Sequence, residues 1–67
     1  MQITVNNQPR ELGDIAITLT QLLAQMNVPE AGTAIALNQN VVSRSSWNDQ
    51  TLEHGDQVMI IRATAGG

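Results

Sequence analysis

The 67-residue sequence contains no cysteine, no lysine, no phenylalanine and no tyrosine. Without cysteine the chain can form no disulfide, no thiolate metal site and no cysteine nucleophile. A single histidine, His54, cannot form a histidine cluster, and the carboxylates are scattered along the sequence. We therefore expect no metal site, no cofactor and no catalytic residue in this chain.

Basic and aromatic residues are also scarce. The only cations are Arg10, Arg44 and Arg62, the formal net charge is −3, and Trp47 is the only aromatic residue. Nucleic-acid binding needs a basic surface to neutralise phosphates and usually aromatic rings on which bases stack. Neither is present, so we expect no nucleic-acid partner.

Long hydrophobic runs are missing as well. Residues 1–5 alternate polar and apolar side chains instead of forming a charged leader with an apolar core, and no run approaches the length of a membrane span. We expect a cytoplasmic, soluble monomer. A chain of 7.2 kDa has room for one small core, which we assign to a single domain over residues 1–62, followed by a flexible tail over residues 63–67.

The first half of the chain predicts a hairpin and a helix. Residues 1–6 have the period-2 pattern of a half-buried strand, residues 6–9 form a turn rich in Asn and Pro, and residues 10–12 form a short second strand. Apolar residues then recur at helical spacing over residues 19–26, after a capping-box pair, Thr18 and Gln21. Asn27 and Pro29 end this helix.

The second half predicts three more strands. Residues 33–37 are a buried strand, residues 38–40 a turn, residues 41–42 a very short strand, and residues 57–64 a central last strand. Between them, Trp47 plugs the open end of the core beneath a 3₁₀-like turn. One helix on one face of a mixed sheet of about five strands is an α+β roll.

The sequence ends in Ala65-Gly66-Gly67. Two glycines form the thinnest peptide, which can enter a narrow enzyme slot, and the terminal carboxylate is ionised at neutral pH and needs activation before it reacts. On the dipeptide alone, a frayed and idle end is the simpler interpretation.

At this point the chain resembles the ubiquitin-like β-grasp sulfur carriers, and most closely the ThiS family of thiamine biosynthesis. Residues 34–38, Ala-Ile-Ala-Leu-Asn, are similar to the family's central strand. Residues 41–44, Val-Val-Ser-Arg, with Trp47 are similar to its h-V-P-R-x-x-W segment, and His54-Gly55-Asp56 stands where the family has D-G-D. Ser43 in place of proline and His54 in place of an acidic residue are departures in turns, which leave the Gly-Gly end unchanged.

The resemblance implies that Gly67 is the covalent site. A ThiF-type enzyme would use ATP to adenylate its carboxylate, a cysteine-desulfurase relay would supply sulfur to form a thiocarboxylate, and thiazole synthase (ThiG-type) would receive that sulfur. Ala65 and Gly66 would be recognised by these partners. The chain itself would be a protein cosubstrate rather than an enzyme.

Exposed residues beside the tail would supply the docking surface for these partners. Val42, Met59, Ile61 and Arg62 are candidates if they lie on the sheet face opposite the helix; the alternative is a half-covered sheet and a solvated arginine. His54 is interpreted as a surface turn residue without a partner. Arg44 is left open between a structural bond to a loop and a partner contact.

Three other functions remain open. The chain is also similar to the small subunit of molybdopterin synthase, although no proline precedes its Gly-Gly end, and a carrier for another sulfur-requiring pathway would share the same chemistry. A ubiquitin-like modifier would join Gly67 to a target lysine. A plain binding module would have an idle tail.

Overall fold

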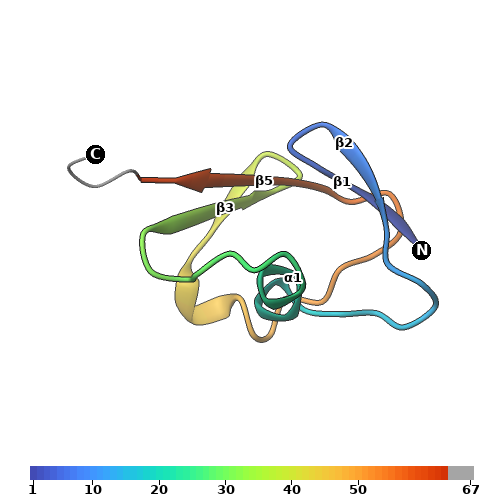
Figure 1. Cartoon of the computed structure of the whole chain (residues 1–67), viewed down its shortest axis with the longest axis horizontal. Helices are drawn as coiled ribbons and strands as arrows, with labels where there is room; N and C mark the ends of the chain where they lie inside the picture. Colours follow the sequence, from blue (N-terminus) through green and yellow to red (C-terminus); the bar gives the residue numbers. More distant parts are fainter. Residues whose placement is uncertain (64–67) are drawn as a thin grey trace.

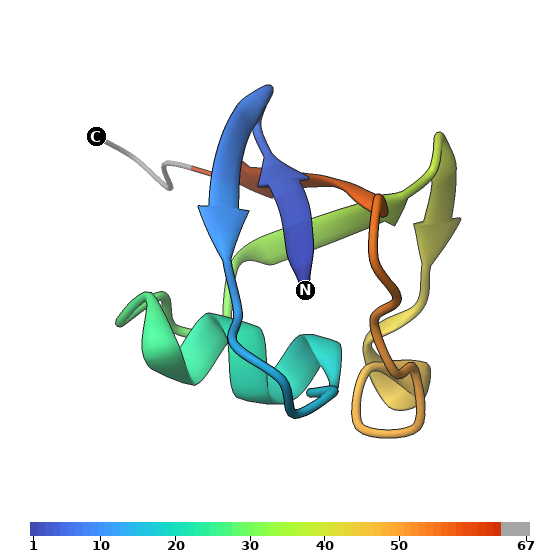
Figure 2. The same cartoon turned by 90° about the vertical axis from the view of Figure 1, so that its right-hand side faces the viewer.

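The computed structural model describes residues 1–63 and contains a five-stranded mixed sheet with one α-helix on one face (Figures 1 and 2). The strand order is β2-β1-β5-β3-β4, with β1 and β5 parallel and the other neighbours antiparallel. The predicted α+β roll is therefore confirmed. The elements are β1 (Gln2–Val5), β2 (Gln8–Glu11), α1 (Leu19–Gln25), β3 (Thr33–Leu37), β4 (Asn40–Val42), a 3₁₀ turn (Arg44–Ser46) and β5 (Gln57–Arg62).

The first hairpin is tighter than predicted. Asn6 and Asn7 alone form the turn, both at positive φ (51° and 67°), and β2 already begins at Gln8. Two consecutive residues with positive φ are typical of a two-residue hairpin turn, and Asn tolerates that conformation. Pro9 lies within β2 opposite Thr4. This is possible because β2 is an edge strand, so the missing N–H of proline interrupts no sheet bond.

Helix α1 begins and ends with local hydrogen bonds. The Thr18 side chain accepts from the Gln21 N–H at 3.2 Å, and the Gln21 side chain accepts from the Thr18 N–H at 2.9 Å, so the predicted capping box is present. At the other end Asn27 has φ 58°, and the Val28 N–H donates to the Leu23 carbonyl at 3.0 Å. This arrangement is a Schellman motif with Asn in place of the usual Gly.

The centre of the sheet is β5, as its apolar residues on both faces predicted. Val58 and Ile60 face the helix and are buried, whereas Met59 and Ile61 face the other side. The strand ends at Arg62 rather than at the predicted residue 64. The last pair between β5 and β3 is Arg62 with Thr33, and one further backbone bond joins the Ala63 N–H to the Gly32 carbonyl at 2.8 Å.

The core lies between the sheet and α1. Trp47 is its largest fully buried side chain, as predicted, and its indole N–H donates to the Val42 carbonyl at 2.8 Å. The sequence interpretation did not assign Ile17 and Leu52 to the core, where both are buried. Among residues 1–63, no helix is long and apolar enough to cross a membrane.

Candidate functional site

The predicted covalent site, Gly67, and the predicted recognition residues Ala65 and Gly66 lie outside the described residues. What the structure does describe is the strand that leads to them. β5 is hydrogen-bonded to β1 on one side and β3 on the other, and it runs toward the end of the molecule opposite Met1 (Figure 1). The C-terminal end of β5 is therefore positioned by its pairing with β3.

The face of the sheet away from α1 carries an exposed apolar patch, which we call the outer patch. Val41 is 82% exposed, Ile61 57% and Met59 39%. These residues are neighbours through the small side chains of β3, because Ala36 pairs with both Val41 and Met59, and Ala34 pairs with Ile61. Contiguous exposed apolar residues of this kind mark interaction surfaces more often than isolated ones do.

Two of the four residues proposed for a docking surface do not belong to this patch. Val42 pairs with Ile35, which is buried, so its side chain faces the core and Val41 takes the outward position. The prediction placed a three-residue turn at residues 38–40, but Asn38 and Gln39 alone form the turn. A register change of one residue exchanges the faces of a strand.

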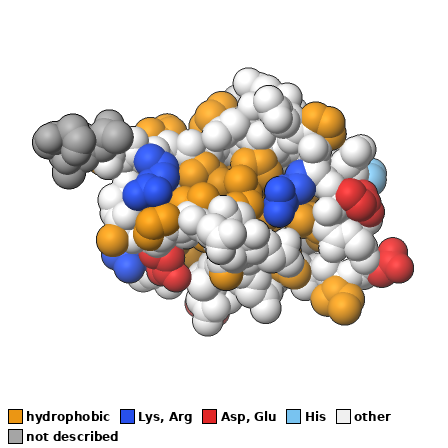
Figure 3. Space-filling view, in the orientation of Figure 1, with side chains coloured by type: hydrophobic (Ala, Val, Ile, Leu, Met, Phe, Trp, Pro, Cys, Tyr) orange, Lys and Arg blue, Asp and Glu red, His pale blue; other side chains and the backbone are white. Residues whose placement is uncertain are grey.

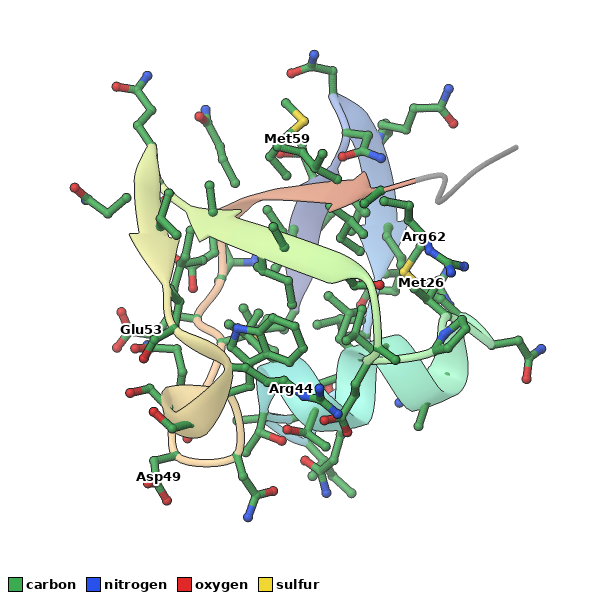
Figure 4. The ribbon with its side chains drawn as sticks, turned by 90° about the vertical axis from the view of Figure 1, so that its left-hand side faces the viewer. Met26, Arg44, Asp49, Glu53, Met59 and Arg62 are labelled. Carbon is green, nitrogen blue, oxygen red and sulfur yellow. The ribbon has the colours of Figure 1, made fainter. Side chains whose placement is uncertain are left out.

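Arg62 also lies on the other face. Side chains alternate along β5, so Arg62 shares the helix-facing side with Val58 and Ile60. Figure 4 shows Met59 above the sheet and Arg62 below it, on the side where Met26 lies. Of the four predicted docking residues, Met59 and Ile61 are thus the two that lie on the sheet face opposite the helix.

A shallow hollow of about 210 Å³ adjoins the outer patch. It lies where β1, β3 and β5 meet, and apolar surface makes up most of its lining. Such a hollow is large enough to receive one apolar side chain of a partner. Its lining residues are Thr4, Asn7, Ala36, Gln39, Gln57, Val58 and Met59.

The motif residues Asn38 and Asp56 hold the start of β5. The Asn38 amide donates to Asp56 Oδ1 at 3.1 Å, and the Gln57 N–H donates to Asn38 Oδ1 at 2.9 Å. The second Asp56 oxygen accepts from the Glu53 N–H at 2.8 Å. Asn38 and Asp56 therefore have a structural role, because their side chains join the turn before β5 to the end of β3.

His54 and Arg44 have structural partners. The Gln2 N–H donates to His54 Nδ1 at 2.9 Å, which corrects the prediction that this side chain lacks a partner. Arg44 Nε lies 3.4 Å from Glu30 Oε1, in an exposed ion pair. Neither side chain lies on the outer patch. Within residues 1–63 there is no group of three or more His, Cys, Asp or Glu side chains placed to hold a metal ion.

Comparison with known proteins agrees with this fold and with the motifs. The sequence pattern of the ThiS family matches residues 3–67. The chain is 36% identical, over the full length of both sequences, to the sulfur carrier protein ThiS of Escherichia coli (strain K12). It is similar to the crystal structure of the thiamine biosynthesis protein ThiS from Geobacter metallireducens, with a TM-score of 0.85, 30% identity and full coverage of both chains.

A solution structure of a thiamine biosynthesis protein from Geobacter metallireducens gives a TM-score of 0.83 at 30% identity, covering this whole chain and 88% of that one. The family match includes the C-terminal glycines as well as the β-grasp domain. The chain therefore belongs to the ThiS family.

Proposed function

We propose that this chain is a sulfur carrier protein of thiamine biosynthesis. The observation that carries the proposal is the match to the ThiS family over residues 3–67, which includes the Gly-Gly end. The full-length similarity to a sulfur carrier protein of Escherichia coli supports it. The chain acts as a cosubstrate, and its partner enzymes perform the catalysis.

The reacting group is the Gly67 carboxylate. One of its oxygens attacks the α-phosphate of ATP on a ThiF-type enzyme, which forms an acyl-adenylate and releases pyrophosphate. The terminal sulfur of a persulfide supplied by a cysteine-desulfurase relay then attacks the acyl carbon and displaces AMP, which gives an acyl disulfide. A second thiol of the partner proteins cleaves the S–S bond of this acyl disulfide, and the products are the thiocarboxylate and a disulfide between the two partner thiols. Thiazole synthase receives this sulfur when it builds the thiazole. We assign these reactions, and the chain as a soluble protein, to the cytoplasm.

The fold suits this chemistry because the working end continues from the central strand. On its β3 side the β5 backbone is bonded up to Ala63, whose N–H donates to the Gly32 carbonyl at 2.8 Å. Residues 64–67 add about 3.3 Å each when extended, so the terminal carboxylate reaches about 13 Å beyond this anchor. That distance allows a reacting atom to enter a buried active site while the domain remains at the enzyme surface.

We assign partner docking to the outer patch, with Met59 and Ile61 from the predicted set and Val41 added. This patch adjoins the strand that leads to the tail. Replacing Ile61 with Ser should weaken binding of the activating enzyme about tenfold, because one buried aliphatic side chain contributes about 1.5 kcal/mol or more. Ile15→Ser is the matched control, since Ile15 is 77% exposed and lies outside the patch. Equal affinities of the two variants would contradict the assignment.

The experiment that tests the carrier function is the intact mass of the chain after incubation with ThiF-type enzyme, ATP and a sulfur donor. We expect a gain equal to one oxygen replaced by sulfur. A chain lacking Gly67, and a chain extended by one residue, should show no gain because the reacting carboxylate is displaced. Conjugation to a lysine of another protein would instead indicate a ubiquitin-like modifier. No change with active enzymes would indicate a binding module.

The receiving pathway requires a second measurement. Thiazole formation by thiazole synthase from the thiocarboxylated chain distinguishes thiamine synthesis from molybdopterin synthesis. Transfer to a molybdopterin precursor, with none to the thiazole, would assign the chain to the other pathway.

A further inference from the structure

A second candidate binding surface lies on the helix-facing side of the sheet and is separate from the outer patch. Figure 3 shows hydrophobic surface between two groups of basic side chains on this face of the molecule. A groove of about 330 Å³ lies here, where the β1–β2 hairpin passes the end of α1. We call it the hairpin groove. Its lining residues are Val5, Asn6, Gln8, Pro9, Arg10 and Met26.

Arg10 supplies the groove with an unused cation. It pairs with buried Ile3 across the hairpin, so its side chain is directed to the inner face of the sheet. Its Nε is buried and has no hydrogen-bond partner among residues 1–63. A buried donor without an acceptor is unfavourable, and a carboxylate is the acceptor that best matches a guanidinium.

Arg62 adds a second cation on the same side of the sheet, at the end of β5. It is exposed, and within residues 1–63 it forms no ion pair, whereas Arg44 is paired with Glu30. The chain as a whole carries a net charge of −3. Two of its three arginines therefore produce a local positive surface on an otherwise acidic protein, and this surface is complementary to carboxylates.

The backbone of β5 is open beside this surface. On the side of β5 that faces β1, Asn6 is the last residue that bonds to the strand. The Asn6 N–H donates to the Val58 carbonyl at 2.9 Å, and Asn6 Oδ1 accepts from the Ile60 N–H at 2.8 Å. N–H and C=O groups alternate sides along a strand, so the Ile60 carbonyl and the Arg62 N–H point to the same side. No group within residues 1–63 bonds to either of them. An extended peptide added here would complete two further bonds.

We propose that the hairpin groove and the open edge of β5 bind an extended, acidic segment of the activating enzyme. The segment bonds to the Ile60 carbonyl and the Arg62 N–H, places a carboxylate beside the Arg10 guanidinium and a second near Arg62, and packs its aliphatic carbons on Val5 and Met26. This inference rests on the proposed function, because it takes as partner the enzyme that acts on the adjoining C-terminus.

Calorimetric titration of the ThiF-type enzyme with the chain, without ATP, tests the groove. Arg10→Gln and Arg62→Glu should each weaken binding about tenfold or more, as expected for loss of a charged hydrogen bond. Arg44→Gln and Arg44→Glu are the matched controls, since they change the charge equally at an exposed ion pair that does not line the groove, and should bind within about twofold of the original chain. Raising the salt concentration should reduce the difference between variants and controls.

Arg62→Glu changes an exposed side chain and keeps the test valid if Arg10→Gln fails to fold. Equal affinities of Arg62→Glu and Arg44→Glu would overturn the proposal, as would no binding of the original chain. The mass measurement with ATP and a sulfur donor is separate. If the chain gains sulfur but the arginine variants bind the enzyme as tightly as the original chain, the groove proposal alone is overturned. If binding depends on the arginines but the chain gains no sulfur, the carrier function alone is overturned.

Discussion

Asp56 accepts hydrogen bonds from two separate parts of the chain, the Asn38 amide and the Glu53 N–H, so its carboxylate ties the turn before β5 to the end of β3. Hydrogen bonds to a charged group contribute about 1.5 to 3 kcal/mol each. Asp56→Ala should therefore lower the free energy of unfolding by about 2 kcal/mol or more. Urea denaturation measures this, with Asp49→Ala as the control. A loss below about 0.5 kcal/mol, the range for plain surface changes, would contradict the structural role.

Glu11 predicts a pH dependence of stability. The Met1 ammonium donates to Glu11 Oε1 at 3.0 Å, and this bond holds the pKa of Glu11 below its ordinary value. A carboxyl group with a lower pKa in the folded state stabilises the protein above its unfolded pKa, and this stabilisation is lost as the pH falls through the folded pKa. Glu11→Gln should thus be less stable than the original chain at pH 7 and equally stable in acid.

Urea denaturation at a series of pH values from 7 downward measures the effect of Glu11. Acetylation of the Met1 amine removes the same bond, and should give the same pH profile as Glu11→Gln. A constant difference between the original chain and Glu11→Gln at every pH would refute the assignment to this ion pair.

The helix illustrates how local chemistry ends an element. The sequence pattern placed its stripe and its capping box correctly, and predicted its end within one residue. Pro29 was expected to contribute to that end, but the Schellman bonds at Asn27 and Val28 complete it before the proline. In a sequence, the end of such a helix is indicated by a residue that tolerates positive φ directly after the last apolar helical position.

The positive φ of Asn27 predicts different effects on stability for replacement by alanine and by glycine. Asn27→Ala should lower the free energy of unfolding by about 1 kcal/mol, because alanine lacks the short polar side chain that lets Asn adopt positive φ. Asn27→Gly should stay within about 0.5 kcal/mol of the original chain, since Gly adopts this conformation without strain. Thermal and urea denaturation compare them. Equal stabilities of the two variants would show that φ does not limit this position.

The two hairpins show what limits prediction at the level of elements. Each strand was recognised, but both turns were assigned more residues than the two that form them. In the second hairpin a three-residue turn would place Val42 on the outer face, whereas the two-residue turn places Val41 there and packs Val42, a predicted docking residue, on the core. Asn38 and Gln39 both have positive φ, but Asn-Gln is not one of the dipeptides that mark a two-residue turn in a sequence, so only the structure shows its length.

At the scale of the whole molecule, Trp47 joins the segment after β4 to the core. It is 1% exposed, and its indole N–H bonds to the Val42 carbonyl. A chain of 67 residues is expected to have a free energy of unfolding of about 3 to 10 kcal/mol. Because Trp47→Ala removes about 3 to 5 kcal/mol, we expect this variant to be largely unfolded at 37 °C.

Trp47→Phe should remain folded but lose about 1 to 3 kcal/mol, since the Val42 carbonyl loses its donor. Circular dichroism during heating measures both Trp47 variants. Ile15→Ala is the control, because that side chain is exposed and its loss should cost less than about 0.5 kcal/mol. A Trp47→Ala melting curve close to that of Ile15→Ala would contradict the central position of the indole.

The sequence by itself determined the absence of cysteine chemistry, the helix stripe, the two faces of β5, the buried tryptophan and the Gly-Gly end. These features depend on residue type or on periodicity within one segment, which are local properties. Only the tertiary structure decided that Val41 rather than Val42 faces outward, that Arg62 lies on the helix side, and that Arg10 lines a groove beside an open edge of β5. Those features depend on register and pairing between segments distant in sequence, where a shift of one residue reverses a face.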